Sequence, residues 1–231
     1  MNVKQSRVIV VDDHPIVRQG LAQMIDREPD LTVCGEAEEA RSALHAIATL
    51  NPDIVVIDIS LNGPSGIEIL KTIRLTDPKL RVLILSMHDE MVYAERALRA
   101  GANGYIMKQE ATEMVLVALR RILGGEVYVS NRVANRMLRQ LVGGAPKARQ
   151  SPVDDLTDRE LEVFRLIGEG HGTRQISDDL HLSVKTVETY QSHIKEKMGL
   201  KNARELVQYA IQWVISESGS VESQQNASGI P

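Results

Sequence analysis

The sequence predicts an α/β domain, built on a five-stranded parallel sheet with helices on both faces, followed by a smaller all-α domain. The first observation is that short apolar segments alternate with helical patterns over about the first 125 residues. The second is that only helical patterns follow the Gly- and Pro-containing segment 143–152. The third is an aromatic content of 3%, which suits helices and buried strands better than a β-sandwich.

The elements of the first domain follow from the spacing of its apolar residues. Between the apolar segments, apolar residues recur at three- and four-residue steps, as in Val17, Leu21 and Met24, so each connection is predicted to be a helix. A further helix is predicted over residues 132–141. The predicted strands are residues 8–11, 31–34, 54–57, 82–85 and 105–107.

The second domain is predicted to begin with a helix capped by Thr157. Thr157 and Glu160 have the spacing of a capping box, and the apolar residues Leu161, Phe164 and Ile167 follow them at helical steps. From about Ser216 the chain is rich in Ser, Gln, Asn and Gly, which is typical of a disordered tail. The expected organisation is a first domain over 5–125, a helix and flexible linker over 126–153, a second domain over 154–215 and a tail over 216–231.

Composition excludes several classes of protein. The 231 residues include one cysteine, Cys34, which cannot form an intramolecular disulfide, and contain no run of eighteen apolar residues. The net charge of -4 argues against a protein that coats nucleic acid non-specifically. We therefore expect a cytoplasmic protein with no membrane segment and no export signal.

Polar side chains end four of the predicted strands. The first strand ends in Asp12 and Asp13, the third in Asp58, the fourth in Ser86 and the fifth in Lys108. The carboxyl ends of parallel strands lie at one edge of the sheet, where ligands of such folds bind. These five side chains are therefore expected to form one pocket.

The chemistry expected of that pocket is phosphoryl transfer to a carboxylate. Three carboxylates repel one another unless a cation lies among them, and acidic oxygen ligands suit Mg²⁺. With such an ion in place, Asp58 can serve as a nucleophile. Ser86 supplies a hydroxyl and Lys108 an ammonium group for the phosphoryl oxygens.

Taken singly, these residues have ordinary interpretations. A lone Asp at a strand end is usually a helix cap or a solvated loop residue, and Ser86 alone can cap the next helix. Tyr105 can be a packed ring with a hydrated hydroxyl. His14 is interpreted as part of the local structure. The convergence of Asp58 and Lys108 with the first-strand aspartates favours the functional reading.

Over residues 5–125 the sequence resembles the receiver domain of bacterial response regulators, a flavodoxin-like, doubly wound fold. The resemblance implies that Asp58 is the phospho-acceptor and that Asp13 binds Mg²⁺ directly. It also implies that Asp12 acts through water and that the backbone carbonyl of Ser60 is a further ligand. The residues that carry the resemblance are Asp12-Asp13-His14-Pro15, Asp58 with Gly63-Pro64-Ser65-Gly66, Ser86 and Lys108.

The same resemblance assigns a conformational switch to Ser86 and Tyr105. Ser86 is the switch hydroxyl, expected to move toward the phosphoryl group, and Tyr105 is the switch aromatic, expected to follow it inward. This change shifts the population toward a state in which the second domain is free to dimerise on DNA.

Two helices joined by a tight turn are predicted within the second domain. The first covers the segment from Thr173 to Leu180, and Ser183 is a good N-cap for the second. The apolar residues of the second helix share one face, and its opposite face carries polar side chains that can reach bases or phosphates. That is the layout of a recognition helix. The candidate DNA-binding residues are Lys185, Thr186, Glu188, Thr189, Ser192 and Lys195.

Residues from about 155 to 215 resemble the LuxR-type helix-turn-helix domain. The resemblance rests on Leu156-Thr157-Asp158-Arg159-Glu160, Thr186-Val187-Glu188-Thr189-Tyr190 and the continuation from Ile194 to Leu200. Together with a receiver domain, it identifies the chain as similar to the NarL/FixJ class of two-component response regulators. In that class, positions equivalent to Glu188, Thr189 and Ser192 lie in the major groove.

The charge of the second domain partly opposes this interpretation. Between Asp154 and Ile215 there are eight Lys or Arg against eleven Asp or Glu, whereas nucleic-acid-binding domains are usually basic. Between Ser183 and Lys201 the balance reverses to four Lys against two Glu, and these lysines are candidates for phosphate contacts. Glu188 either accepts a hydrogen bond from a cytosine amino group or is a surface acid without a DNA contact.

The expected partners are a sensor histidine kinase, promoter DNA and a second copy of the chain, with RNA polymerase as a further candidate. Two surfaces are candidates for dimerisation: the receiver face around 91–119 and the last helix, around 203–214. Mg²⁺ is the only expected cofactor, and no enzymatic activity is expected beyond Mg²⁺-dependent phosphorylation of the chain itself from a phosphohistidine donor. Two alternatives remain: an aspartyl-phosphate phosphatase, and a regulator whose helical domain binds a protein instead of DNA.

Overall fold

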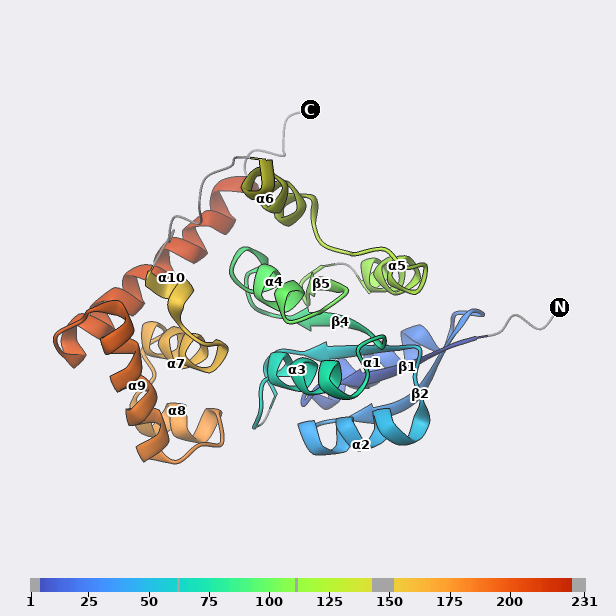
Figure 1. Ribbon diagram of the computed structural model, residues 1–231, viewed down its shortest axis with the longest axis horizontal. Helices are drawn as coiled ribbons and strands as arrows, with labels where there is room; N and C mark the ends of the chain where they lie inside the picture. The colour runs from blue at the N-terminus through green and yellow to red at the C-terminus, as the bar shows by residue number, and fades with distance from the viewer. Residues whose placement is uncertain (1–4, 62, 111, 143–151, 226–231) are drawn as a thin grey trace. The chain divides into compact units, whose positions relative to one another are not determined.

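The computed structural model describes residues 5–61, 63–110, 112–142 and 152–225, which form two compact units separated between residues 144 and 145 (Figure 1). The segment expected to be a flexible linker falls largely on residues 143–151, which lie outside the described residues.

The first unit contains the expected five-stranded parallel sheet. The strands have the order β2-β1-β3-β4-β5, and every neighbouring pair is parallel. The strands are β1 (Ser6–Val11), β2 (Leu31–Ala37), β3 (Ile54–Asp58), β4 (Arg81–Ser86) and β5 (Gly104–Met107). All five predicted strands are confirmed, and each is one to three residues longer at one or both ends than predicted.

Helices cover both faces of the sheet. Val8 and Val10 pack with Leu21 and Leu119 in one core, which α1 and α5 close. Ile9, between the two valines, is fully buried on the opposite face, which α2, α3 and α4 cover. The helices of this unit are α1 (Pro15–Ile25), α2 (Ala40–Leu50), α3 (Gly66–Thr76), α4 (Glu90–Arg99), α5 (Thr112–Leu123) and α6 (Asn131–Val142). This arrangement confirms the doubly wound fold expected from the sequence.

The strand order places a topological switch point at the carboxyl ends of β1 and β3. The chain runs outward from β1 to β2 and then returns across β1 to β3, so the connections leaving β1 and β3 diverge to opposite faces. A crevice for ligands forms at such a point. Asp12 and Asp13 follow β1, and Asp58 ends β3, so all three lie there.

The start of α3 is packed tightly against the end of β3. The Ser65 hydroxyl accepts a hydrogen bond from the Glu68 N–H, and the Glu68 carboxylate accepts one from the Ser65 N–H, so the helix begins with a capping box. A Cβ atom at Gly66 would lie 2.0 Å from the backbone oxygen of Asp58. The site's strand end and the first turn of α3 are therefore in direct backbone contact, which only glycine permits.

Over its described residues, 152–225, the second unit contains only helices and turns, as expected. It begins with the 3₁₀ helix η1 (Pro152–Asp155), and Thr157 and Glu160 form the predicted capping box at the start of the next helix. Phe164 lies at the centre of the core, with its ring 5.5 Å from that of Trp213. The remaining elements are α7 (Asp158–Gly168), α8 (Thr173–Asp179), α9 (Val184–Met198) and α10 (Ala203–Gln225).

The predicted disordered tail is wrong for residues 216–225, because α10 continues to Gln225. Ser, Glu and Gln lower the apolar content but do not end a helix, and the nearest proline is Pro231. Residues 226–231 lie outside the described residues. Among the described helices, none combines the length and the apolarity that crossing a membrane requires.

Candidate phosphoryl-acceptor site and DNA interface

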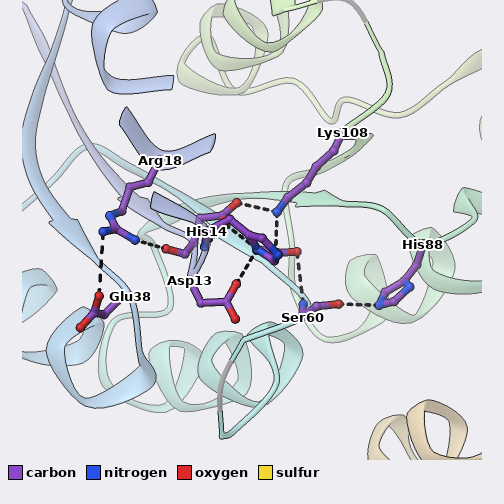
Figure 2. A network of polar contacts seen from close by, with 9 residues as sticks. Asp13, His14, Arg18, Glu38, Ser60, His88 and Lys108 are labelled. Carbon is purple, nitrogen blue, oxygen red and sulfur yellow. Dashed lines mark hydrogen bonds and ion pairs between the residues drawn. The ribbon is translucent and has the colours of Figure 1, made fainter. Parts of the chain in front are cut away.

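Lys108 joins the carboxylates of two neighbouring strands at the carboxyl edge of the sheet. Its Nζ lies 2.7 Å from Asp58 Oδ2 and 2.6 Å from Asp12 Oδ2 (Figure 2). Both aspartates are almost fully buried, and the Lys108 side chain is 8% exposed. The backbone N–H of Lys108 donates to the carbonyl of Ser86, which fixes the lysine to the end of β4. The residues predicted from four strand ends thus occupy one site.

The pKa of Asp58 is raised from 3.8 to about 6. Burial is the largest cause, because it disfavours the charged carboxylate, and the Asp12 charge raises the pKa further. The Lys108 ammonium and the Ser60 N–H oppose this shift without cancelling it. Ionised Asp58 is therefore under-compensated, which favours the approach of additional positive charge.

The donor set of this site fits a divalent cation. One ligand atom each from Asp12, Asp13, His14 and Asp58 lies within 4.8 Å of the others. Three of these groups are carboxylates, and two of them pair with the Lys108 ammonium group. Hard oxygen donors with excess negative charge match the requirements of Mg²⁺. The chemistry of these residues is consistent with the expected cofactor.

His14 is more closely involved than the sequence indicated. Its Nδ1 lies 2.7 Å from Asp13 Oδ1 and 3.3 Å from Asp12 Oδ1, although its side chain is 64% exposed. Its backbone N–H also donates to Asp12 Oδ1. The residue caps the start of α1, so its proximity follows from local backbone geometry, which a strand-end pattern does not reveal.

Arg18 is a second polar contact of this edge that the sequence did not reveal. Its guanidinium donates to the backbone carbonyl of Asp12 at 2.6 Å (Figure 2), and it also pairs with Glu36 at 3.3 Å. The spacing of one helical turn from His14 to Arg18 was the only available signal, and it is not specific. Arg18 fixes the backbone of an acidic residue without touching its carboxylate.

Ser60 contacts the Asp58 carboxylate through its backbone. Its N–H donates to Asp58 Oδ1 at 3.2 Å, and its hydroxyl is hydrogen-bonded to Nε2 of His88 at 2.8 Å. The structure therefore places Ser60 beside Asp58, as the sequence predicts. The role of its carbonyl as a metal ligand stays a prediction.

Ser86 and Tyr105 meet at the backbone of His88. The His88 N–H donates to Ser86 Oγ at 3.1 Å, and the Tyr105 hydroxyl donates to the His88 carbonyl at 2.7 Å. Tyr105 is 1% exposed and lies in the inward position, and burial raises its pKa well above the usual 10. The two predicted switch residues are thus connected through a residue that the sequence analysis did not single out.

In the second unit, α9 presents the polar face expected of a recognition helix. Lys185, Glu188, Thr189 and Ser192 are exposed, whereas Thr186 and Lys195 are partly buried. The hydroxyls of Thr189 and Ser192 donate to backbone carbonyls one turn earlier, those of Lys185 and Glu188. Their oxygens can still accept hydrogen bonds from a base or a lysine.

Thr186 has a structural role at the start of α9. Its N–H donates to the Ser183 hydroxyl, and its own hydroxyl lies 2.7 Å from the same atom. This pairing completes the helix cap that the sequence predicts at Ser183.

One lysine of the locally basic segment, Lys197, is exposed but pairs with a carboxylate of α7. Lys197 Nζ lies 2.6 Å from the Glu160 carboxylate, which is 3% exposed. Burial raises the pKa of Glu160, but hydrogen bonds from Lys197 and Thr157 together outweigh it, so the net shift is downward. Lys197 therefore neutralises a buried carboxylate, and phosphate contacts by the lysines of this segment stay a prediction.

Two family models match the chain. Residues 8–120 match the response regulator receiver domain, and residues 154–210 match the luxR family of bacterial regulatory proteins. The oxygen regulatory protein NreC of Staphylococcus aureus is 34% identical over 209 residues, which are 89% of this chain and 96% of that relative.

Solved structures lead to the same family. A LuxR-family two-component response regulator from Aurantimonas sp. SI85-9A1 is 38% identical, with a TM-score of 0.56 over 60% of this chain and 99% of that one. RcsB from Salmonella enterica serovar Typhimurium, bound to the promoter rprA in the presence of the phosphomimetic BeF3-, is 25% identical, with a TM-score of 0.60 over 90% and 98% of the two chains. The chain belongs to the family of DNA-binding response regulators in which a receiver domain precedes a LuxR-type helix-turn-helix domain.

Proposed function

We propose that Asp58 accepts a phosphoryl group from a sensor histidine kinase and that this modification controls promoter binding by the second domain. The observation that carries the proposal is the arrangement of Asp58, Lys108 and Asp12 at the switch point of the sheet. A buried nucleophilic carboxylate lies against an ammonium group, next to the acidic residues that suit a divalent cation.

The proposed reaction is an in-line displacement at phosphorus. A carboxylate oxygen of Asp58 attacks the phosphoryl group of a phosphohistidine, the P–N bond breaks, and the histidine leaves with its electron pair. An Mg²⁺ ion held by Asp13 and Asp58, with Asp12 and the Ser60 carbonyl as further contacts, would supply the positive charge that this site lacks.

Lys108 and Ser86 serve the phosphoryl oxygens in this proposal. The Lys108 ammonium already contacts Asp58 Oδ2, so it can follow that carboxyl group as its charge moves to the phosphoryl oxygens. Ser86 Oγ accepts from the His88 N–H and retains its own hydrogen for donation. Tyr105, on the neighbouring strand, is hydrogen-bonded to the His88 carbonyl, so its position depends on the connection between β4 and α4.

The DNA-binding part of the proposal rests on α9 and α10. Lys185, Glu188, Thr189 and Ser192 are exposed on α9 and are proposed to contact the major groove, with Thr186 and Lys195 at its margin. A single helix makes few contacts, so we propose that two copies bind adjacent half-sites in the bacterial cytoplasm.

A row of apolar residues on α10 supports the choice of dimer surface. Val207, Ile211 and Ile215 are spaced by four residues and are 43%, 38% and 64% exposed. Such a row lies on one side of a helix and is suited to pack on its copy in a second chain. This favours α10 over the receiver face around 91–119.

Phosphorylation of Asp58 is tested by intact mass after incubation with acetyl phosphate and Mg²⁺. Wild type is expected to gain one phosphoryl group, and Asp58→Asn none. Glu38→Gln is the matched control, because Glu38 is an exposed carboxylate at the same edge, 3.9 Å from Arg18. Removal of Mg²⁺ with a chelator is expected to suppress the gain. Equal addition to Asp58→Asn would overturn the assignment.

Two simple measurements address the alternatives. Sustained turnover of a generic phosphate ester would favour a phosphatase, whereas a single phosphorylation event fits a receiver domain. Retention on DNA that falls as salt increases is expected, because phosphate contacts release counterions.

A further inference from the structure

His88 occupies the connection between β4 and α4 and contacts three parts of the site at once. Its N–H donates to Ser86 Oγ, and its carbonyl accepts from the Tyr105 hydroxyl. Its ring Nε2 is hydrogen-bonded to the Ser60 hydroxyl, 2.8 Å away on the connection that follows β3 (Figure 2). A displacement of His88 would therefore alter contacts with all three residues.

The ring of His88 is held in place from two sides. It stacks on the ring of Tyr93 in α4, with 4.6 Å between centroids and 24° between planes, and Ser60 binds its polar edge. The residue is 7% exposed. A packed ring with a bonded nitrogen has little rotational freedom, so the position of its backbone depends on both contacts.

Ser60 is also tied directly to the phospho-acceptor. Its N–H donates to Asp58 Oδ1, two residues earlier in the chain. Three hydrogen bonds therefore link Asp58 to Ser60, Ser60 to His88 and His88 to Tyr105. This path is separate from the direct approach of Ser86 to a phosphoryl group.

We propose that His88 is a positioning residue that couples the Asp58 loop to Tyr105 through its bond with the Ser60 side chain. The bond holds the β4–α4 connection where its carbonyl receives the Tyr105 hydroxyl, and this stabilises the inward position of Tyr105. The proposal rests on the proposed function for the identity of the signal that uses this path. The stabilisation itself is a property of the receiver domain alone.

The test is a double-mutant cycle on the full chain. Ser60→Ala removes the hydroxyl, and His88→Phe keeps a ring for stacking on Tyr93 but removes the bonding nitrogen. Ser60→Thr retains a hydroxyl and is the conservative control. Tyr105 is followed by fluorine NMR of chains containing 3-fluorotyrosine, with its resonance assigned by Tyr105→Phe, before and after incubation with acetyl phosphate and Mg²⁺.

Each single variant is expected to lower the ratio of inward to outward Tyr105 about fivefold, which is typical for the loss of one hydrogen bond. The double variant is expected to show no larger change than either single variant, because both remove the same interaction. Ser60→Thr is expected to keep the wild-type ratio. If His88→Phe does not fold, the comparison of Ser60→Ala with Ser60→Thr carries the test.

Two outcomes would overturn the proposal. One is an unchanged Tyr105 ratio together with a lower thermal unfolding midpoint, which is the result expected of a purely structural bond. The other is additivity of the two single effects. Failure of wild type to gain phosphoryl mass would instead refute the proposed function, and the ratio measured without acetyl phosphate would still decide the role of His88.

Discussion

Lys108 balances the charges of the site at the scale of single residues. Its ammonium contacts one oxygen of Asp58 and one of Asp12, and no single strand supplies both partners. Burial still raises the pKa of Asp58 to about 6, so one lysine does not fully offset the cost of the buried charge. The ionised Asp58 carboxylate therefore lowers the free energy of unfolding at neutral pH.

This cost gives Asp58→Asn a predicted effect on stability. The folded-state pKa lies above the unfolded value of 3.8, so the stabilising contribution is present below pH 3.8 and is lost as pH rises through about 6. At pH 7.5, without divalent cations, the variant is expected to be more stable than wild type by about 3 kcal/mol. Urea denaturation at pH 4.5 and 7.5 measures the difference, which should shrink at the lower pH.

The control for this effect is Glu38→Gln, which removes an exposed carboxylate and should leave the unfolding free energy almost unchanged. Addition of Mg²⁺ should narrow the gap between wild type and Asp58→Asn at pH 7.5. A variant less stable than wild type at that pH would contradict the assignment of Asp58 as an under-compensated buried charge.

At the scale of elements, α9 is joined to α7 by an ion pair. Lys197, near the end of α9, pairs with Glu160, whose carboxylate also completes the capping box at Thr157. One carboxylate thus fixes the start of α7 and the C-terminal half of α9. The pair therefore joins α9 to the start of α7, beside the packing of the buried Val187 and Ile194.

Lys197→Met is expected to destabilise the second unit by about 1–3 kcal/mol, because a buried carboxylate loses its charged partner. The pKa of Glu160 is lowered in the folded state, so its contribution is present above pH 4.5 and is lost as pH falls through the lowered value. Fluorescence of Trp213, the single tryptophan, reports unfolding of this unit. The exposed Lys201→Met is the control, and an equal loss in both variants would argue against the pairing.

The sequence predicted elements well because their signals are local. Apolar segments ending in Asp12, Asp58, Ser86 and Lys108 revealed the strands and the shared edge, since parallel strands place their carboxyl ends together. The role of His88 was not predicted, because its hydrogen bonds with Ser86 and Tyr105 are made by its backbone and no residue pattern encodes them.

Two other features depended on contacts that composition does not show. The contact between Lys197 and Glu160 joins residues 37 positions apart, so a count of charges in the segment does not reveal it. The last helix extends beyond the predicted limit because polar residues reduce burial without stopping a helix.

At the scale of the whole molecule, binding to an operator is predicted to require two copies of the chain. Ile211→Lys places a charge in the apolar row of α10, so it is expected to abolish dimerisation and to weaken binding to a selected operator by at least about tenfold. Analytical ultracentrifugation and fluorescence anisotropy measure the two effects. Acetyl phosphate should still modify Asp58, since α10 lies in the other unit.

Leu75→Lys is the matched control for Ile211→Lys, because Leu75 is an exposed apolar residue on α3 with an exposure of 87%. The control should keep wild-type assembly and operator affinity. Unaltered dimerisation in Ile211→Lys would move the interface to the receiver face around 91–119.

The backbone contact between Gly66 and Asp58 restricts which sequences this fold can accept. Any side chain at position 66 would begin with an atom 2.0 Å from the Asp58 carbonyl oxygen, so tolerance there requires the strand end to move. A glycine with no chemical role is thereby as intolerant of replacement as a reactive group. In a saturation library selected for signalling, variants at position 66 should be depleted. The cause would be the close backbone contact with Asp58, not the loss of a functional side chain.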